Sequence, residues 1–457
     1  MNLQTLISPR IRGLISIVVE SSIIITSFVT AVSLRYEAEL LVPKALLVTL
    51  VLELCFYYGG LHEGRTNRRR TERFLRLGQS YLVAMVLLSL VYYVFPDLRV
   101  GRGIQAIFFP LSFISILLWR ELYFWIFAQR ALNETVLILG TGATAIHIAK
   151  ETLKRSPLGY NVKGFLGEHP AEVGRRLVNP HVIGTVSDLT DQVEDVGATL
   201  IVVALEDRRK KMPVQELLHC RLSGIRVEEA PDFYEKLTGR VLVSNLRPSW
   251  IVFSQGFNKP RYLRSAKQLG EFLFALVLTV VMAPLFLLLA ILIKIDSRGP
   301  VFYRQERVGE NSKAFALFKL RTMRADAESK TGPIWASSKA DCRITRVGHW
   351  LRKTRLDELP QLFNVLRGEM SFVGPRPERP YFVDQLRKVI PYYDERHSVK
   401  PGITGWAQIN YRYGATIEDT EMKLEHDLYY IKHMSLLLDF AIILDTFKVM
   451  VLGKGAR

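Results

Sequence analysis

The chain has 457 residues, of which 49% are hydrophobic and 23% are charged. This composition excludes a disordered chain, a collagen-like chain and a small disulfide-bonded scaffold, and the length allows two or three domains. Lysine and arginine exceed aspartate and glutamate by 61 − 44 = 17 residues, and this excess indicates an anionic partner such as nucleic acid, anionic lipid or a phosphorylated ligand.

Four apolar segments occupy the first 130 residues. They cover residues 11–34, 43–61, 74–95 and 104–127, and each has aromatic residues near at least one end. A helix needs about 20 apolar residues to cross a bilayer, and aromatic residues gather at the membrane surface. We therefore expect a membrane α-helical bundle of four N-terminal transmembrane helices within residues 1–130.

The loop charges give this bundle an orientation. Residues 62–73, between the second and third segments, contain five arginines. Cytoplasmic loops carry an excess of arginine and lysine, so the chain is expected to return to the cytoplasm near Arg130. Glu20, Glu53 and the pair Arg120–Glu121 lie in or near the segments. They fit a transport path or contacts between helices, and the lack of a regular series favours contacts.

A fifth apolar segment covers residues 269–295 and has basic residues on both flanks. Pro284 follows Ala283 near its middle. Proline removes a backbone hydrogen bond and kinks a helix. We expect a re-entrant membrane helix that breaks at Ala283 and Pro284 and returns to the side from which it entered. The alternative is a fifth span, which would put the C-terminal domain outside the cell.

Residues 131–250 show alternating strand and helix patterns. A strand at 135–139 is followed by Gly140-x-Gly142-x-x-Ala145, and Glu168 follows the second strand. Such glycines allow a tight turn in which backbone amides approach a phosphate. We expect a Rossmann-like domain that either binds a nucleotide or serves as a degenerate scaffold. The scaffold is favoured because no Tyr-x-x-x-Lys pair follows.

The C-terminal part, residues 251–457, concentrates charged residues among glycine and proline. The adjacent acids Asp357 and Glu358 begin a predicted helix, where two carboxylates would ordinarily complement the helix dipole by about 0.3–1 kcal/mol each. Basic residues nearby in the sequence suit a different role, since arginines neutralise phosphate oxygens, one carboxylate attacks phosphorus and another holds Mg²⁺. These basic residues are Lys319, Arg321, Arg352, Arg376 and Arg412.

Five ordered motifs make residues 259–457 resemble the bacterial sugar transferase family, the monotopic polyprenyl-phosphate phosphoglycosyl transferases. The motifs are Phe302-Tyr-Arg-Gln-Glu-Arg-Val-Gly309, Phe318-Lys-Leu-Arg-Thr-Met323, Arg352-Lys-Thr-Arg-Leu-Asp-Glu-Leu-Pro-Gln361, Ser371-Phe-Val-Gly-Pro-Arg-Pro-Glu378 and Lys400-Pro-Gly-Ile-Thr-Gly-Trp406. The whole chain is similar to the family's large members, which combine four spans, a Rossmann-like middle domain, a re-entrant helix and an α/β catalytic domain. Residues 246–257 are similar to the exopolysaccharide branch associated with PEP-CTERM systems, and Glu369 stands where the family usually has aspartate.

The resemblance implies a two-step transfer. Asp357 would attack the β-phosphorus of a UDP-sugar and release UMP. Undecaprenyl phosphate would then attack the aspartyl-phosphosugar to give undecaprenyl-diphospho-sugar, which starts an exopolysaccharide repeat unit. By motif position, Glu358 is the implied Mg²⁺ ligand and Arg376 the nucleotide contact. The implied phosphate-binding residues are Arg352 and Arg412, with Lys319 and Arg321 as further site residues.

The same resemblance implies a location and partners. The protein is expected in the bacterial inner membrane, with its middle and catalytic domains in the cytoplasm. The large members of the family also suggest a homodimer. Anionic inner-leaflet lipid and phosphorylated substrates account for the positive charge, so no nucleic acid is expected. Residues 434–450 are predicted to form an interfacial amphipathic helix, with a core helix as the alternative.

Two other functions compete with this interpretation. A membrane-anchored NAD-dependent sugar-nucleotide dehydratase or epimerase would use the Gly140 loop but lacks the Tyr/Lys pair. A membrane scaffold or sensor leaves Asp357 and Glu358 unexplained. The sequence does not specify the sugar, so glucose, galactose and N-acetylated hexoses remain candidates.

Overall fold

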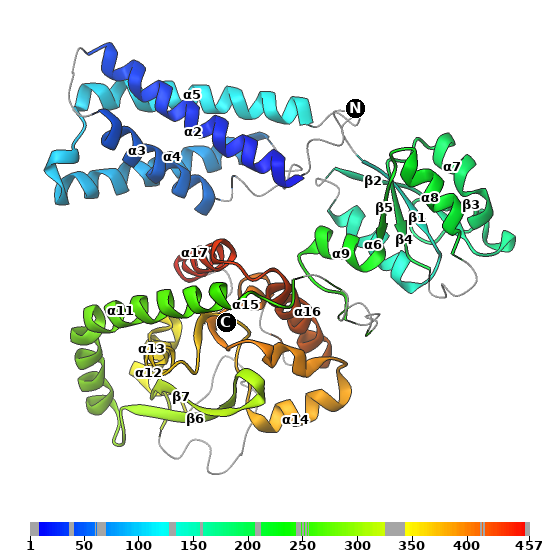
Figure 1. Cartoon of the computed structure of the whole chain (residues 1–457). Helices are drawn as coiled ribbons and strands as arrows, with labels where there is room; N and C mark the ends of the chain where they lie inside the picture. Colours follow the sequence, from blue (N-terminus) through cyan, green and yellow to red (C-terminus); the bar gives the residue numbers. More distant parts are fainter. Residues whose placement is uncertain are drawn as a thin grey trace. The chain divides into compact units, whose positions relative to one another are not determined.

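The structure is a computed structural model that describes most of the chain (Figure 1). The described residues are 9–35, 41–59, 61, 70–127, 134–155, 159–205, 212–243, 248, 251, 254, 256–324, 343–411, 414 and 416–452. The chain separates into two compact units, Met1–Phe233 and Tyr234–Arg457.

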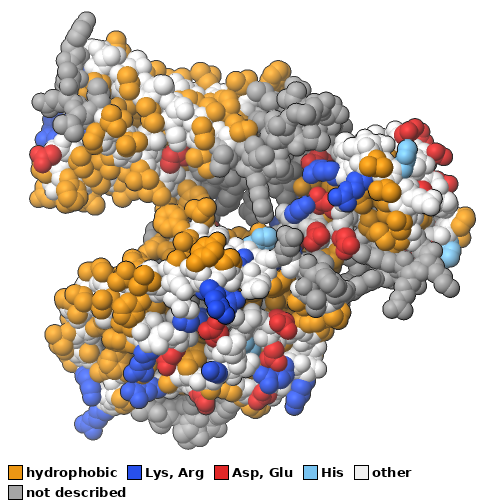
Figure 2. Space-filling view, viewed as in Figure 1, with side chains coloured by type: hydrophobic (Ala, Val, Ile, Leu, Met, Phe, Trp, Pro, Cys, Tyr) orange, Lys and Arg blue, Asp and Glu red, His pale blue; other side chains and the backbone are white. Residues whose placement is uncertain are grey.

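The first unit begins with a helical bundle. Its described helices are α2 (Pro9–Ser33), α3 (Leu41–Tyr58), α4 (Arg70–Val94) and α5 (Arg102–Phe127). Segments of α2, α4 and α5 are long and apolar enough to cross a membrane, and the second predicted span forms the 18-residue α3. Hydrophobic side chains occupy much of the face of this bundle seen in Figure 2, and many large apolar side chains of its helices are exposed. Because water-soluble proteins rarely expose such large apolar surfaces, the chain is a membrane protein.

Charged side chains inside the bundle pair with one another. The Arg120 guanidinium lies 2.6 Å from the carboxylate of Glu20, which is fully buried. Ser16 donates to Glu20 at 2.8 Å, and Ser21 donates to Glu53 at 2.9 Å. Buried charges in membrane helices are costly unless they are paired. These contacts therefore agree with a role in holding the helices together.

A five-stranded parallel sheet follows the bundle in the sequence. The strand order is β3-β2-β1-β4-β5. The strands are β1 (Glu134–Leu139), β2 (Tyr160–Gly167), β3 (Val182–Thr185), β4 (Leu200–Val203) and β5 (Arg226–Glu229), and the connecting and following helices are α6 (Ala143–Lys154), α7 (Leu189–Asp195), α8 (Val214–Leu222) and α9 (Ala230–Thr238). Alternate residues of β1 and β4 pack against α7 and α8. Right-handed crossovers then put α6 on the opposite face, so both faces of the sheet are covered.

The second unit begins with the 36-residue helix α11 (Arg261–Asp296), which contains Pro284. Figure 1 shows α11 bent part-way along its length. Only 11% of the most apolar stretch of α11 is buried in the protein. Large apolar side chains such as Val277, Val280 and Leu287 are exposed. This helix is the fourth that meets the requirements for membrane insertion among the described residues.

The remainder of the unit surrounds two small sheets. β6 (Phe302–Val308) and β7 (Ala314–Leu320) form an antiparallel hairpin, and β8 (Ser371–Val373) pairs in parallel with β9 (Gly402–Thr404). The helices are α12 (Arg346–Thr354), α13 (Gln361–Leu366), α14 (Pro380–Val389), α15 (Trp406–Asn410), α16 (Ile417–His433) and α17 (Leu436–Leu452). The first hairpin leads into the acidic pair through α12, and the second sheet carries the two glycine- and proline-rich motifs.

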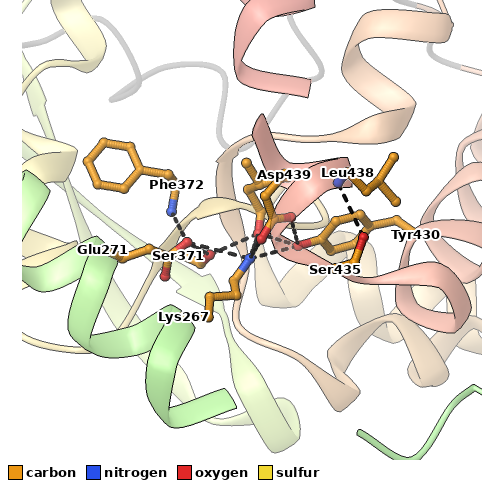
Figure 3. A network of polar contacts seen from close by, with 9 residues as sticks. Lys267, Glu271, Ser371, Phe372, Tyr430, Ser435, Leu438 and Asp439 are labelled. Atoms are coloured by element: carbon orange, nitrogen blue, oxygen red, sulfur yellow. Dashed lines mark hydrogen bonds and ion pairs between the residues drawn. The ribbon is translucent and has the colours of Figure 1, made fainter. Parts of the chain in front are cut away.

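A polar network attaches the first half of α11 to the rest of the unit (Figure 3). Lys267 Nζ lies 2.7 Å from Asp439 Oδ2 of α17 and 2.8 Å from the Tyr430 hydroxyl of α16. Glu271 accepts from the Ser371 hydroxyl at 2.5 Å, at the start of β8. The other end of α11 is held as well, because the Val347 amide of α12 donates to Asp296 at 3.0 Å.

Helix α17 occupies the region predicted to be interfacial. It buries Ile442 and Asp439 against the unit and exposes Leu437, Phe440 and Phe447. A helix with one packed face and one exposed apolar face suits the surface of a bilayer. The predicted interfacial helix is therefore compatible with its packing.

Candidate active site

The acidic pair lies in a tight turn between α12 and α13. α12 ends at Thr354, and the capping residue Arg355 has a left-handed backbone with φ 60°. A short 3₁₀ turn, η7 (Leu356–Glu358), follows, and Pro360 directly precedes the next helix, where its fixed φ is tolerated. This reversal turns the chain sharply and presents two consecutive carboxylates at one point.

Glu358 is held by two basic residues from separate elements. Lys319 Nζ of β7 lies 2.8 Å from Glu358 Oε1, and Arg376 Nη2 lies 3.1 Å from the same oxygen. Burial alone would raise the pKa of Glu358, but Lys319 and Arg376 outweigh it and hold the pKa well below its usual range. Glu358 is therefore ionised at neutral pH.

Asp357 is buried, and it differs from Glu358 in its contacts with the described residues. Its carboxylate makes no hydrogen bond or ion pair with any residue that the structure describes. Burial raises the pKa of Asp357, Lys319 opposes that rise, and the charge of Glu358 adds to it. When ionised, a carboxylate without hydrogen-bond donors among the described residues keeps its lone pairs available, as a nucleophile requires.

The structure brings together most of the predicted basic residues. Lys319 and Arg376 contact Glu358 directly, and Arg352 is among the charges that lower the pKa of Asp357. Arg352 Nε also donates to the Thr322 hydroxyl at 2.9 Å, which fixes the side chain in the last turn of α12. Four sequence-predicted residues thus accompany Asp357 in one polar cluster.

Arg321 lies elsewhere. Its guanidinium is 95% buried and donates to the backbone carbonyls of Ser297 at 2.6 Å and Arg298 at 3.0 Å. These carbonyls follow the end of α11, so Arg321 secures the membrane helix and does not contact Glu358. Arg412, the other predicted phosphate-binding residue, lies outside the described residues, as do residues 62–69 of the arginine-rich loop.

Comparisons with known proteins identify the family. The model for the bacterial sugar transferase family matches residues 262–453. A "UDP-glucose:undecaprenyl-phosphate glucose-1-phosphate transferase" of Xanthomonas campestris pv. campestris is 34% identical, over 78% of this chain and 75% of its own length. This chain belongs to the bacterial sugar transferase family.

Further relatives differ in the sugar that their names contain. A "UDP-N-acetylgalactosamine-undecaprenyl-phosphate N-acetylgalactosaminephosphotransferase" of Aeromonas hydrophila is 42% identical over 58% of this chain, which spans 62% of that relative. An "Undecaprenyl-phosphate glucose phosphotransferase" of Komagataeibacter xylinus is 32% identical, over 72% of this chain and 61% of its own length. A structure titled "Crystal structure of RSP in complex with beta-NADH" has a TM-score of 0.20 at 16% identity, over 34% of this chain and 84% of its own, which carries no inference.

In this sugar transferase, two residues that support the acidic pair, Asn364 and Gln408, were not predicted from the sequence. Asn364 of α13 is fully buried and donates to the Ala316 carbonyl at 2.8 Å and to Glu369 at 2.7 Å, while its Oδ1 accepts from the Phe318 amide at 3.1 Å. It holds β7, and so Lys319, next to α13. Gln408 of α15 accepts from Arg376 Nη1 at 3.3 Å. The sequence hints at this role of Asn364 only through an amide side chain among the apolar residues of the short helix.

Close backbone contacts fix the segment that carries Arg376. A Cβ added to Gly374 would lie 2.4 Å from the Lys400 carbonyl oxygen, and one added to Gly405 would lie 2.2 Å from the Gly374 carbonyl oxygen. Only glycine fits either position. The Gly374-Pro-Arg376 and Lys400–Trp406 motifs of the transferase are therefore locked together by backbone contact.

The carboxylate pair fits a magnesium ion that arrives with a diphosphate. The described residues contain no cluster of three or more histidine, cysteine, aspartate or glutamate residues that would form a complete metal site. Mg²⁺ usually takes one or two protein carboxylates and completes its shell with substrate phosphates and water. Both basic contacts of Glu358 use Oε1, and its Oε2 has no hydrogen bond to a described residue. This oxygen and the Asp357 carboxylate are suitable donors.

The glycine loop of the parallel sheet is arranged differently. Gly140 has φ 119°, and a Cβ there would lie 2.8 Å from the Ala204 carbonyl oxygen. The turn after β1 therefore requires glycine at this position. The Thr141 hydroxyl donates to Glu172 at 3.0 Å, and the Glu168 amide donates to the same carboxylate at 2.9 Å. Burial would raise the pKa of Glu172, but these hydrogen bonds and that from His169 lower it. A negative charge therefore lies beside this loop.

Proposed function

We propose that this protein transfers a sugar 1-phosphate from a UDP-sugar to undecaprenyl phosphate. The observation that carries the proposal is the carboxylate of Asp357, which has no partner among the described residues and lies beside Glu358, whose charge is held by Lys319 and Arg376. The names of the relatives, which combine UDP-sugars with undecaprenyl phosphate, support the same substrates.

In the first step, an oxygen of Asp357 forms a bond to the β-phosphorus of the donor. The bond from that phosphorus to the bridging oxygen breaks, and UMP leaves with the electron pair. Lys319, Arg352 and Arg376 neutralise the phosphate oxygens on which charge accumulates. A Mg²⁺ ion held by Glu358 and the diphosphate would supply further charge stabilisation.

In the second step, a phosphate oxygen of undecaprenyl phosphate attacks the phosphorus of the aspartyl-phosphosugar. The bond to Asp357 breaks, the carboxylate is regenerated, and undecaprenyl-diphospho-sugar forms. A covalent intermediate lets one site meet a soluble donor and a lipid acceptor in turn. The product would start an exopolysaccharide repeat unit.

We further propose that α11 is re-entrant and that the catalytic unit lies in the cytoplasm below the inner membrane. Contacts at both ends of α11 support this topology, since Lys267 and Asp296 are bound by the same folded unit. A helix that crossed the bilayer would separate these ends. Pro284 supplies the break in the backbone hydrogen bonding. The sheet of the first unit is proposed to be a Rossmann-like scaffold, and a homodimer is proposed from the family resemblance.

The reaction is tested with protein in nanodiscs, undecaprenyl phosphate, Mg²⁺ and a panel of UDP-sugars. We expect UMP release with one donor, and none without Mg²⁺ or in Asp357→Asn. Intact mass measured after adding the donor alone should rise by one phosphosugar. Folded protein that gives neither UMP nor an adduct with any UDP-sugar contradicts the proposal.

A further inference from the structure

Two arginines outside the acidic cluster donate hydrogen bonds to backbone carbonyls at and after Arg376. Arg396 Nη2, from the turn η8 (Tyr393–Ser398), donates to the carbonyl oxygen of Arg376 at 3.0 Å. Arg307 Nη1, from β6, donates to the carbonyl oxygen of Pro377 at 3.1 Å. Two consecutive carbonyls are thus anchored by charged donors from separate parts of the chain.

The first of these arginines is itself rigidly held. Arg396 is 95% buried, and its Nη2 lies 2.8 Å from Asp427 Oδ2 of α16, which is 98% buried. Its Nη1 donates to the Tyr393 hydroxyl at 2.7 Å. Burial would lower the pKa of Arg396, but Tyr393 and Asp427 raise it, so the guanidinium stays charged. Such a group has little freedom to move.

A buried ion pair is weak support for stability, because apolar residues of similar volume often stabilise a fold as well or better. The Arg396–Asp427 pair therefore calls for another role. The contact of Arg396 Nη2 indicates such a role, since this atom donates a hydrogen bond to the backbone carbonyl of Arg376, the residue that contacts Glu358.

The second arginine fixes the other side of the same turn. Arg307 also lies 3.5 Å from Glu378 Oε2, and the neighbouring Val308 amide donates to the Glu378 carbonyl at 2.9 Å. β6 is thereby joined along the Pro375–Glu378 segment. The sequence motif around Arg307 has no other role in the proposed chemistry.

Building on the proposed function, we propose that Arg396 and Arg307 are positioning residues that aim the Arg376 side chain at the donor diphosphate. Anchoring the carbonyls of residues 376 and 377 fixes the peptide planes on the C-terminal side of Arg376, and so the direction in which its side chain leaves the backbone. A displacement of about 1 Å at a catalytic group can cost about 10²-fold in rate. Neither arginine needs to touch the substrate for this effect.

The decisive variant removes the ion pair without leaving a buried charge. In Arg396→Met/Asp427→Leu, apolar side chains replace both partners, and the fold is expected to persist. We expect the KM for the UDP-sugar to rise about tenfold or more, while kcat changes less, because the misaimed Arg376 weakens donor binding. Arg396→Lys, which keeps the charge but not the forked donor, should fold and should still show a raised KM.

Arg307→Gln gives a second, independent route, since no buried carboxylate loses its partner. It should also raise KM. The matched control is Arg387→Gln, which breaks an exposed arginine–aspartate pair with Asp394 at 3.1 Å in the same unit and should leave KM unchanged. Melting temperatures are recorded for all variants.

The outcomes separate the two proposals. Variants that melt lower but keep the wild-type KM would show a purely structural role and overturn the inference. Wild-type protein that releases no UMP overturns the proposed function, and with it this inference. A raised KM in both Arg307→Gln and the double variant, with an unchanged Arg387→Gln, supports it.

Discussion

Two regions of this molecule carry residues that the sequence associates with phosphate, and their surroundings differ. At the glycine loop after β1, the carboxylate of Glu172 accepts hydrogen bonds from Thr141 and Glu168. At the turn after α12, the carboxylate of Asp357 has no partner among the described residues, while basic side chains converge on its neighbour. The glycine motif thus coincides with a tight backbone turn, and the second region leaves a buried carboxylate without a partner among the described residues.

The charges of the two regions reinforce this difference. The pKa of Glu172 is lowered, so the loop carries a negative charge at neutral pH and disfavours a phosphate. Around Asp357, Lys319, Arg352 and Arg376 favour one. If the proposed function holds, unpaired groups and net local charge are what distinguish the proposed active site from the proposed scaffold.

The largest test of this contrast is Asp357→Asn. We expect UMP release to fall at least ~10³-fold, because the amide is no nucleophile and no covalent intermediate can form. Release is measured with the preferred UDP-sugar, and intact mass should show no phosphosugar adduct. Residual activity above one tenth of wild type would mean that another group attacks the phosphorus.

A smaller effect is expected from Lys319→Gln. At neutral pH the rate should fall about 10²-fold, since a charge at the diphosphate is lost. The nucleophile must be ionised, so activity decreases as the pH falls through the raised pKa of Asp357. Lys319 lowers that pKa, and its removal should raise it further and move the acid limb of the kcat/KM profile to higher pH. An unshifted acid limb would contradict the assignment.

Asn364→Ala tests the frame that supports the cluster. It leaves the Phe318 amide and the Ala316 carbonyl without their partner, at a cost of about 2–3 kcal/mol in the free energy of unfolding. The melting temperature should drop accordingly. Asn410→Ala is the control, because Asn410 is exposed and donates to the Trp406 carbonyl of its own helix at 3.0 Å. Equal melting temperatures for the two variants would remove the structural role given to Asn364.

The smallest effect is expected at the other region. Glu172→Gln should leave UMP release within about twofold of wild type, because no step of the proposed chemistry uses the glycine loop. A loss greater than tenfold would give the first unit a part in the reaction and weaken the comparison.

The sequence was sufficient to predict those candidate site residues that short local motifs specify. The adjacency of Asp357 and Glu358 and the motifs of Lys319 and Arg376 led to residues that the structure brings together. Arg321, only two positions after Lys319, turns away because β7 ends at Leu320 and the chain leaves the strand. Local spacing predicts neither the end of a strand nor the partner beyond it.

The contacts that support Arg376 could not be predicted from the sequence for a related reason. Gln408 and Arg396 meet the Arg376 segment from 32 and 20 residues away. Their approach depends on backbone packing at Gly374 and Gly405, which sequence pattern alone does not encode. The parallel sheet, by contrast, followed from alternating strand and helix signals, because its central strands β1 and β4 are short, apolar and buried.

The interlocked glycines have a practical consequence for redesign. Gly374 contacts Lys400 and Gly405 through backbone atoms. A poor fit between the two segments therefore cannot be relieved by changing the size of a side chain at these contacts. Chimaeras that import one of the two loops from a relative with another sugar would have to match a foreign backbone to the resident one. Residues 371–378 and 400–408 therefore form a single cassette, to be exchanged together or not at all.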